Sequence, residues 1–168
     1  MARLFALDQN FPQPLVRAVT PFMPEVELVP IREINPRLAD MEDWQVLLAL
    51  HHHERHWDGL VTTDSSMLNQ PRELAVVRQT NLTLVVAHDS GHDPIKATGL
   101  LLAHLDYICA RPKRDEPQIW QLTANNRPGR DPWEWLEKAA RHQHRDIELL
   151  WNEGQLSAAE LRRDPLAD

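Results

Sequence analysis

The stretch "GLVTTDSSML" (residues 59–68) decides the fold, because it is an apolar, β-branched run that stops abruptly at Asp64. β-Branched residues favour strands. An Asp after a strand is usually a turn former, because its side chain bonds to nearby backbone groups. A second run, "LTLVVA" (82–87), is continuously apolar, which is typical of a strand buried on both faces of a sheet.

Working outward from these two runs, strands alternate with helices along the chain. We expect strands at 3–7, 26–31, 59–63, 82–87 and 118–124 and a loop at 35–40. We expect helices at 12–19, 41–56, 71–80, 93–111 and 131–154, and one short helix after residue 156. This alternation predicts an α/β fold in three layers, with a mainly parallel sheet of about five strands. A length of 168 residues suits one domain, residues 1–168, with a helical C-terminal extension over 131–168.

Charge and composition limit the classes of function. The net charge of −7 argues against broad, nonspecific coating of nucleic acid, which needs a basic face, and it suits an acidic metal site. Cys109 is the only cysteine, so no intrachain disulfide is expected. No apolar run approaches the roughly 18 residues of a membrane span, and Asp8 interrupts any apolar leader. We therefore expect a cytoplasmic protein without membrane contact.

A second interpretation of Asp64 comes from the other carboxylates in the sequence. Asp8 follows the first predicted strand and Asp64 the third, so a parallel sheet would put both at one edge. Asp40, Glu42 and Asp43 open the next helix, and any of them could add an oxygen ligand. Two bare charges about 4 Å apart cost roughly 4 kcal/mol at an effective dielectric of about 20. Mg²⁺ or Mn²⁺ would remove that cost, but spacing alone favours three unrelated turn and cap residues over a metal site.

Three motifs in order resemble those of the PIN-like domain family. "LFALDQNFPQPLVRAV" (4–19) resembles the family's opening strand, which runs into Asp-Glu-Asn-apolar-Pro and then a helix. "DWQVLLAL" (43–50) resembles its Asp-led helix, and "LVTTDSSML" (60–68) resembles its strand ending in Thr-x-Asp. The resemblance covers residues 3–88.

Family membership would imply a function and a set of site residues. PIN domains are typically Mg²⁺- or Mn²⁺-dependent ribonucleases, and many are toxins of toxin–antitoxin pairs. The resemblance thus implies a metal-dependent endoribonuclease acting on RNA, with an antitoxin protein or a second copy of the chain as candidate partners. It would place catalytic and metal-binding roles on Asp8, Asp43 and Asp64. Supporting residues would be Asn10, Thr62, Ser65, Asp40 and Asp89.

Two departures from the family pattern favour an alternative function. Gln9 stands where the family has Glu, and Ser66 stands where some members carry a second Asp. The alternative is a PIN-like module with weak or no catalysis that binds protein or RNA. Four tryptophans in the C-terminal third, Trp120, Trp133, Trp135 and Trp151, favour core packing or a partner interface over base stacking.

The remaining clusters each have two interpretations. Arg111, Lys113 and Arg114 could grip a phosphate backbone, but such a run is more often a solvated loop. His52 and His56 would lie one turn apart on a helix, as in some zinc sites, or form a solvated helix end. "HDSGHDP" (88–94) reads best as a turn and a helix start, with Asp89 as a further carboxylate at the sheet edge.

Overall fold

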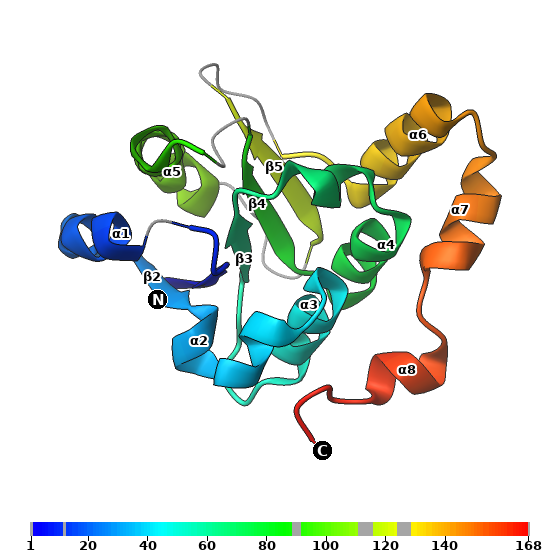
Figure 1. Cartoon of the computed structure of the whole chain (residues 1–168), viewed down its shortest axis with the longest axis horizontal. Helices are drawn as coiled ribbons and strands as arrows, with labels where there is room; N and C mark the ends of the chain where they lie inside the picture. Colours follow the sequence, from blue (N-terminus) through cyan, green and yellow to red (C-terminus); the bar gives the residue numbers. More distant parts are fainter. Residues whose placement is uncertain (1, 12, 89–91, 111–115, 124–128, 168) are drawn as a thin grey trace.

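Five strands form one sheet within the described residues of this computed structural model, which are 2–11, 13–88, 92–110, 116–123 and 129–167. The strands are β1 (Arg3–Leu7), β2 (Val26–Pro30), β3 (Gly59–Thr62), β4 (Thr83–Ala87) and β5 (Gln118–Leu122). They lie in the order β2-β1-β3-β4-β5, and every neighbouring pair is parallel (Figure 1). The predicted α/β fold with a five-stranded parallel sheet is therefore confirmed.

Helices cover both faces of the sheet, which gives the predicted three layers. The helices α1 (Gln13–Val19) and α5 (Pro94–Ala110) lie on one side, and α3 (Asp43–His52), α4 (Pro71–Thr80) and α6 (Pro132–Gln143) lie on the other (Figure 1). The strands feed both layers, because successive side chains point to opposite faces. In β1, Leu4 and Ala6 pack toward α3 and α4, whereas Phe5 and Leu7 pack toward α1 and α5.

A single glycine allows β3 to lie against β4 at its start. A Cβ atom added to Gly59 would come within 1.8 Å of the backbone oxygen of Thr83. Only glycine permits such an approach between two backbones. The first residue of "GLVTTDSSML" is therefore as important for the sheet as the apolar run behind it.

The connections contain short helices that the sequence did not indicate. These are η1 (Thr20–Phe22), α2 (Ile31–Ile34), η2 (Pro36–Asp40) and η3 (Ser65–Asn69). The prediction of a loop at 35–40 is wrong, because Asn35 accepts a hydrogen bond from the Arg37 N–H and starts the 3₁₀ helix η2. The prediction of a helix over 41–56 is too long, because α3 ends at His52.

The predicted single helix over 131–154 is also wrong. The chain turns at His144, whose φ of 53° is left-handed and ends α6. Asp146 then accepts hydrogen bonds from the N–H groups of Glu148 and Leu149, and this cap starts α7 (Ile147–Gly154). The last helix is α8 (Ala158–Arg162).

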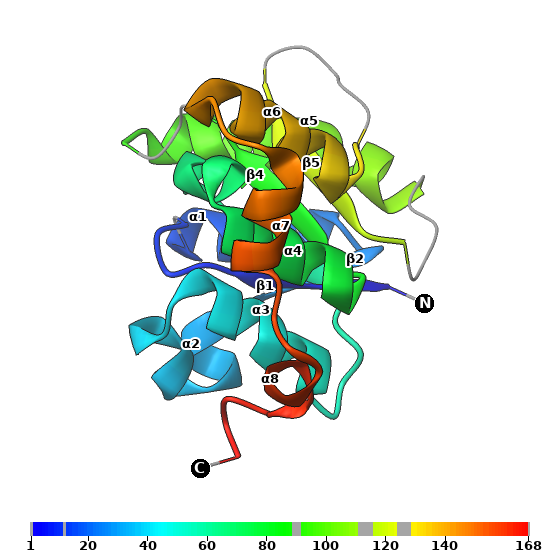
Figure 2. The ribbon, with the colours of Figure 1, turned by 90° about the vertical axis from the view of Figure 1, so that its right-hand side faces the viewer.

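This C-terminal segment packs mainly against α4. Both α6 and α7 contact α4, and Figure 2 shows α7 running across α4 toward α8. The helical spacing of apolar residues over 131–154 predicts one buried stripe; of its residues, the structure buries Trp135, Leu136, Ala139, Ala140 and Leu150, whereas His142 and Leu149 are exposed. The buried face therefore runs along most of α6, ends before His142 and resumes at Leu150 in α7.

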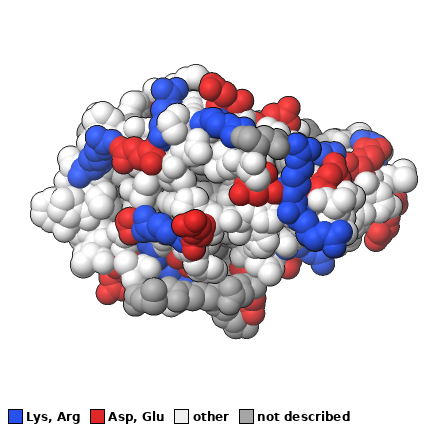
Figure 3. All heavy atoms as spheres, turned by 90° about the horizontal axis from the view of Figure 1, so that it is seen from below, with Lys and Arg blue, Asp and Glu red and all other residues white. Residues whose placement is uncertain are grey.

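Surface charge is mixed rather than segregated. On the face shown in Figure 3, Lys and Arg side chains are interspersed with Asp and Glu side chains. Among the described residues, no helix is long and apolar enough to cross a membrane.

Candidate functional site

Asp8 and Asp64 lie at the same edge of the sheet. The strands that precede them, β1 and β3, are parallel neighbours, with Leu7 opposite Val61. The Asp8 N–H continues the pairing by donating to the Val61 carbonyl at 2.9 Å. This edge carries the carboxyl ends of all five strands, where ligands bind in open α/β sheets. The expectation that a parallel sheet puts Asp8 and Asp64 at one edge is confirmed.

The hydroxyl of Thr62 joins the two aspartates. It donates to Oδ2 of Asp8 at 2.9 Å and accepts from the N–H of Asp64 at 3.0 Å. The other oxygen of Asp8 accepts from the Gln9 N–H at 2.7 Å, and the side-chain amide of Asn10 lies 3.4 Å from Oδ2. The Asp8 carboxylate is therefore buried and held in one orientation by its neighbours.

Asp64 does act as a turn residue, as its type suggests. One carboxylate oxygen accepts from the Ser66 N–H at 2.8 Å and caps η3. This hydrogen bond explains why an Asp follows β3. It does not explain why a negative charge lies at this edge of the sheet. The next residue, Ser65, hydrogen-bonds through its hydroxyl to Nδ1 of His88 at 3.1 Å. His88 directly follows β4, so it adds an imidazole to the same edge.

Asp43 brings a third carboxylate from the first residue of α3. Its pKa is raised to about 6, first by burial and then by the negative charges of Asp8, Asp64, Glu73 and Glu42. Burial likewise raises the pKa of Asp8, with a smaller contribution from Asp64. Three acids from three separate elements therefore interact electrostatically at one edge of the sheet.

Of the three acids near the start of α3, Asp43 is the best placed. Asp40 is exposed at the end of η2. The Glu42 carboxylate accepts from Nε1 of Trp44 at 2.6 Å, so it is engaged beside the helix start. Asp43 is half-buried, and the charges of Asp8 and Asp64 both contribute to its raised pKa.

Sequence reasoning missed two residues of this edge. Glu73 lies in the first turn of α4, and its pKa is raised mainly by burial and further by Glu42 and Asp64. In the sequence Glu73 resembles an ordinary acid at a helix start, and His88 resembles a loop residue. Only the strand order and the direction of α4 bring them to the acidic edge.

The carboxylates fit a divalent cation by their chemistry. Mg²⁺ and Mn²⁺ prefer hard oxygen ligands, and a cation would offset the repulsion that raises the pKa of Asp43. As they stand, however, no three His, Cys, Asp or Glu side chains of the described chain form a ready-made set of ligands. The edge thus has suitable donors and a firmly held Asp8, without an assembled coordination shell.

Several predicted residues fall elsewhere. Asp89, Arg111, Lys113 and Arg114 lie outside the described residues. The zinc interpretation of His52 and His56 is wrong in its geometry, because α3 ends at His52 and the two residues do not share a helix. Nε2 of His52 instead hydrogen-bonds with the Leu161 carbonyl at 2.8 Å.

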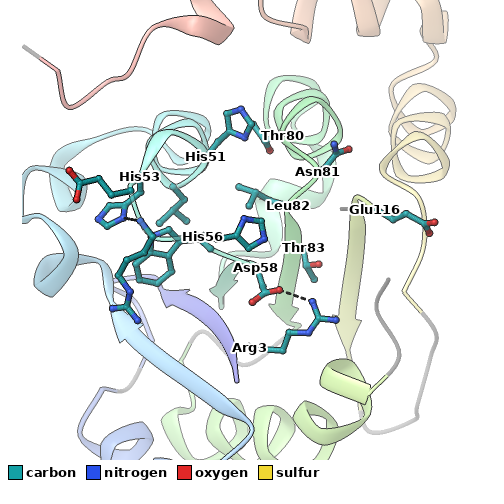
Figure 4. Close-up of a pocket in the computed structure, with 14 residues that line it drawn as sticks. Arg3, His51, His53, His56, Asp58, Thr80, Asn81, Leu82, Thr83 and Glu116 are labelled. Carbon is teal, nitrogen blue, oxygen red and sulfur yellow. Dashed lines mark hydrogen bonds and ion pairs between the residues drawn. The ribbon is translucent and has the colours of Figure 1, made fainter. Parts of the chain in front are cut away.

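A cavity of about 330 Å³ lies at the opposite edge of the sheet (Figure 4). Its lining includes His51, His53 and His56, and the ion pair between Arg3 and Asp58 closes one side at 2.6 Å. Asp58 also accepts from the Leu4 N–H at 2.8 Å. These bonds tie the start of β1 to the residue before β3, which gives this ion pair a structural role.

Comparisons of the chain with protein-family models, with curated proteins and with solved structures found no significant match.

Proposed function

We propose that this protein is a metal-dependent endoribonuclease of the PIN-like type that hydrolyses RNA phosphodiesters with Mg²⁺ or Mn²⁺. One observation carries the proposal. Asp8, Asp43 and Asp64 come from three elements and interact at the carboxyl edge of a parallel sheet, where the pKa of Asp43 is raised to about 6. Perturbed acids that gather at such an edge are typical of functional sites.

In this proposal Asp8, Asp43 and Asp64 hold the cation. When bound, the cation supplies Lewis-acid polarisation of the phosphoryl oxygen and an activated water. The Thr62 hydroxyl, the Asn10 amide and the Gln9 N–H fix the orientation of the Asp8 carboxylate, as groups behind metal ligands commonly do. Asp43 must lose its proton to bind, so cation affinity should rise with pH through about 6.

The experiment is cleavage of single-stranded RNA with Mn²⁺ and with EDTA. Asp8→Asn and Asp64→Asn keep the size of the side chain but remove one charge each and replace one acceptor oxygen by an NH2 group, and both should abolish cleavage. The matched control is Glu134→Gln, which removes one charge from an exposed position in the first turn of α6 and should leave cleavage unchanged. Cleavage that survives EDTA or either Asp variant would refute the proposal.

The toxin role is a further part of the proposal and requires a protein partner. An antitoxin would suppress cleavage when both proteins are produced together, and growth of the producing cells would recover. A homodimer is the other candidate assembly. Light scattering of the purified chain tests this separately, because a dimer has twice the mass of the 19.5 kDa monomer.

A PIN-like binding module without catalysis is the second candidate function. It is favoured by Gln9 and Ser66, which replace family carboxylates, and by the lack of an assembled ligand set in the described chain. The C-terminal tryptophans no longer support a partner interface, because Trp120 and Trp135 are buried and Trp133 contacts Trp151 edge-to-face. RNA binding without cleavage, together with no thermal shift on adding Mn²⁺, would favour this module.

A further inference from the structure

A shallow depression adjoins the acidic edge beside Asp8. It has a volume of about 500 Å³ and is lined by Gln9, Asn10, Phe11, Gln13, Pro14 and Arg32. Gln9 and Asn10 belong to both places, because the backbone N–H of Gln9 and the side-chain amide of Asn10 donate to the Asp8 carboxylate. A substrate phosphodiester at Asp8 would therefore have this depression directly beside it.

Arg32 lines the depression from the segment that follows the neighbouring strand. It lies in α2, which follows β2, and β2 pairs with β1 along its whole length. Its Nη2 atom lies 3.5 Å from the side-chain oxygen of Gln9. The depression is thus formed by the segments that follow two adjacent strands, at the same edge of the sheet as the acids.

The side chains that line the depression differ in type and charge from the acids next to it. Three carboxamides and one guanidinium line the depression, and none of its described lining residues is acidic, although the chain carries 25 Asp and Glu residues. A carboxamide pairs best with the N6 and N7 atoms of adenine, and a guanidinium with O6 and N7 of guanine. Both favoured partners are purines. The volume lies within the usual range of small-ligand sites, about 300–1,000 Å³.

We infer that this depression binds an unpaired purine base of the RNA, in the nucleotide next to the phosphodiester at Asp8. The inference rests on the proposed function and adds a sequence preference to it. Unpaired bases in single-stranded RNA expose the edges that such side chains can reach. Arg32 and Gln13 are the residues that distinguish purines, whereas Asn10 also orients Asp8.

The experiment sequences the ends of the products after Mn²⁺-dependent cleavage of a randomised single-stranded RNA. The wild type should cleave next to a purine at one fixed position. Arg32→Leu and Gln13→Leu, which each remove all hydrogen-bonding groups of the side chain, should each lower kcat/KM for purine-containing RNA by about tenfold, the loss expected for one base contact. They should leave cleavage next to pyrimidines almost unchanged. Arg141→Gln, which removes a charge from an exposed residue of α6, is the matched control.

Each outcome tests the purine site, the proposed nuclease function, or both. A purine preference that Arg32→Leu and Gln13→Leu erase, and that Arg141→Gln retains, supports the inference. Cleavage with no preference, with a pyrimidine preference, or with a purine preference that survives both variants overturns the inference and leaves the proposed function intact. Absence of any cleavage by the wild type overturns both. Melting temperatures of the variants within about 2 °C of the wild type show that the fold is retained, as expected for surface substitutions.

Discussion

Replacing Asp43 by Asn should stabilise the metal-free protein at neutral pH. Asp43 is half-buried at the start of α3, and its pKa is raised to about 6 by burial and by Asp8, Asp64, Glu73 and Glu42. Asparagine has almost the same shape and cannot ionise. The variant therefore removes the repulsion while retaining the packing.

The magnitude follows from the difference between the folded and ordinary pKa values. A rise from 3.8 to about 6 corresponds to about 3 kcal/mol of folded-state penalty for the charged form. Because the side chain is partly exposed, solvent screening lowers this to about 1–2 kcal/mol. The variant also loses a favourable interaction with the α3 N-terminus, about 0.3–1 kcal/mol. The repulsion outweighs that loss, so we expect a net gain of about 1 kcal/mol, or about 2–4 °C in Tm.

The pH dependence identifies the cause of the gain. A raised folded pKa means that the contribution of Asp43 to stability is fully present below about 3.8 and is lost as pH rises through about 6. The variant should therefore match the wild type near pH 4 and exceed it at pH 7.5. Urea denaturation in EDTA measures both, with Glu134→Gln as the control for a first-turn acid. Equal gains at both pH values, or a loss at pH 7.5, would refute the electrostatic account.

Three further predictions test the packing. Leu150→Ala should lower the free energy of unfolding by about 2–5 kcal/mol, because Leu150 is fully buried. Leu149 is exposed, so Leu149→Ala should change it by no more than about 0.5 kcal/mol in the same urea titration. Similar losses in the two variants would contradict the packing of α7. Gly154→Ala should cost about 1–3 kcal/mol, because its Cβ would lie 2.6 Å from a backbone oxygen of α4. Gly99→Ala should raise the free energy of unfolding by about 0.5–1 kcal/mol, because the Cβ atom would have no neighbour within 4 Å beyond its own helix backbone. In calorimetry, Gly154→Ala should lower Tm and Gly99→Ala should raise it, and shifts of the same sign would contradict this account. His144→Gly should gain up to about 1 kcal/mol at its left-handed φ, and a lower Tm would contradict that origin of the helix break.

The sheet could be predicted from sequence because its strands carry an unambiguous signal. All four residues of β3 and all five of β4 are buried, so neither strand alternates apolar with polar residues, and each expected strand overlaps an observed one. The helix boundaries were harder. The apolar spacing of α6 continues past His144, so periodicity alone joins two helices that a left-handed residue separates. The signal that could have found the break was Asp146, which caps α7.

The sequence predicts only those site residues whose positions follow from the direction of the strands. Parallel strands put Asp8 and Asp64 at one edge whatever the other details, and the structure places them there. The choice of Asp43 over Asp40 and Glu42 came from resemblance, because spacing along the chain cannot say which side chain of a helix start turns inward. Glu73 and His88 were missed because their positions depend on the strand order and on how α4 packs.

The acidic edge is also where this chain departs most clearly from what folding stability favours. Elsewhere the buried acid Asp58 is paired with Arg3 and capped by the Leu4 N–H. At the carboxyl edge, Asp8, Asp43 and Glu73 are wholly or partly buried, and burial and the charges of neighbouring acids raise their pKa values. A like-charged cluster of this kind costs stability unless a cation joins it, and proteins retain such costs mainly where function requires them. One edge of the sheet thus holds an acid paired with Arg3, and the other holds acids that repel one another. This contrast is the physical argument for testing cation and RNA binding at the end of "GLVTTD".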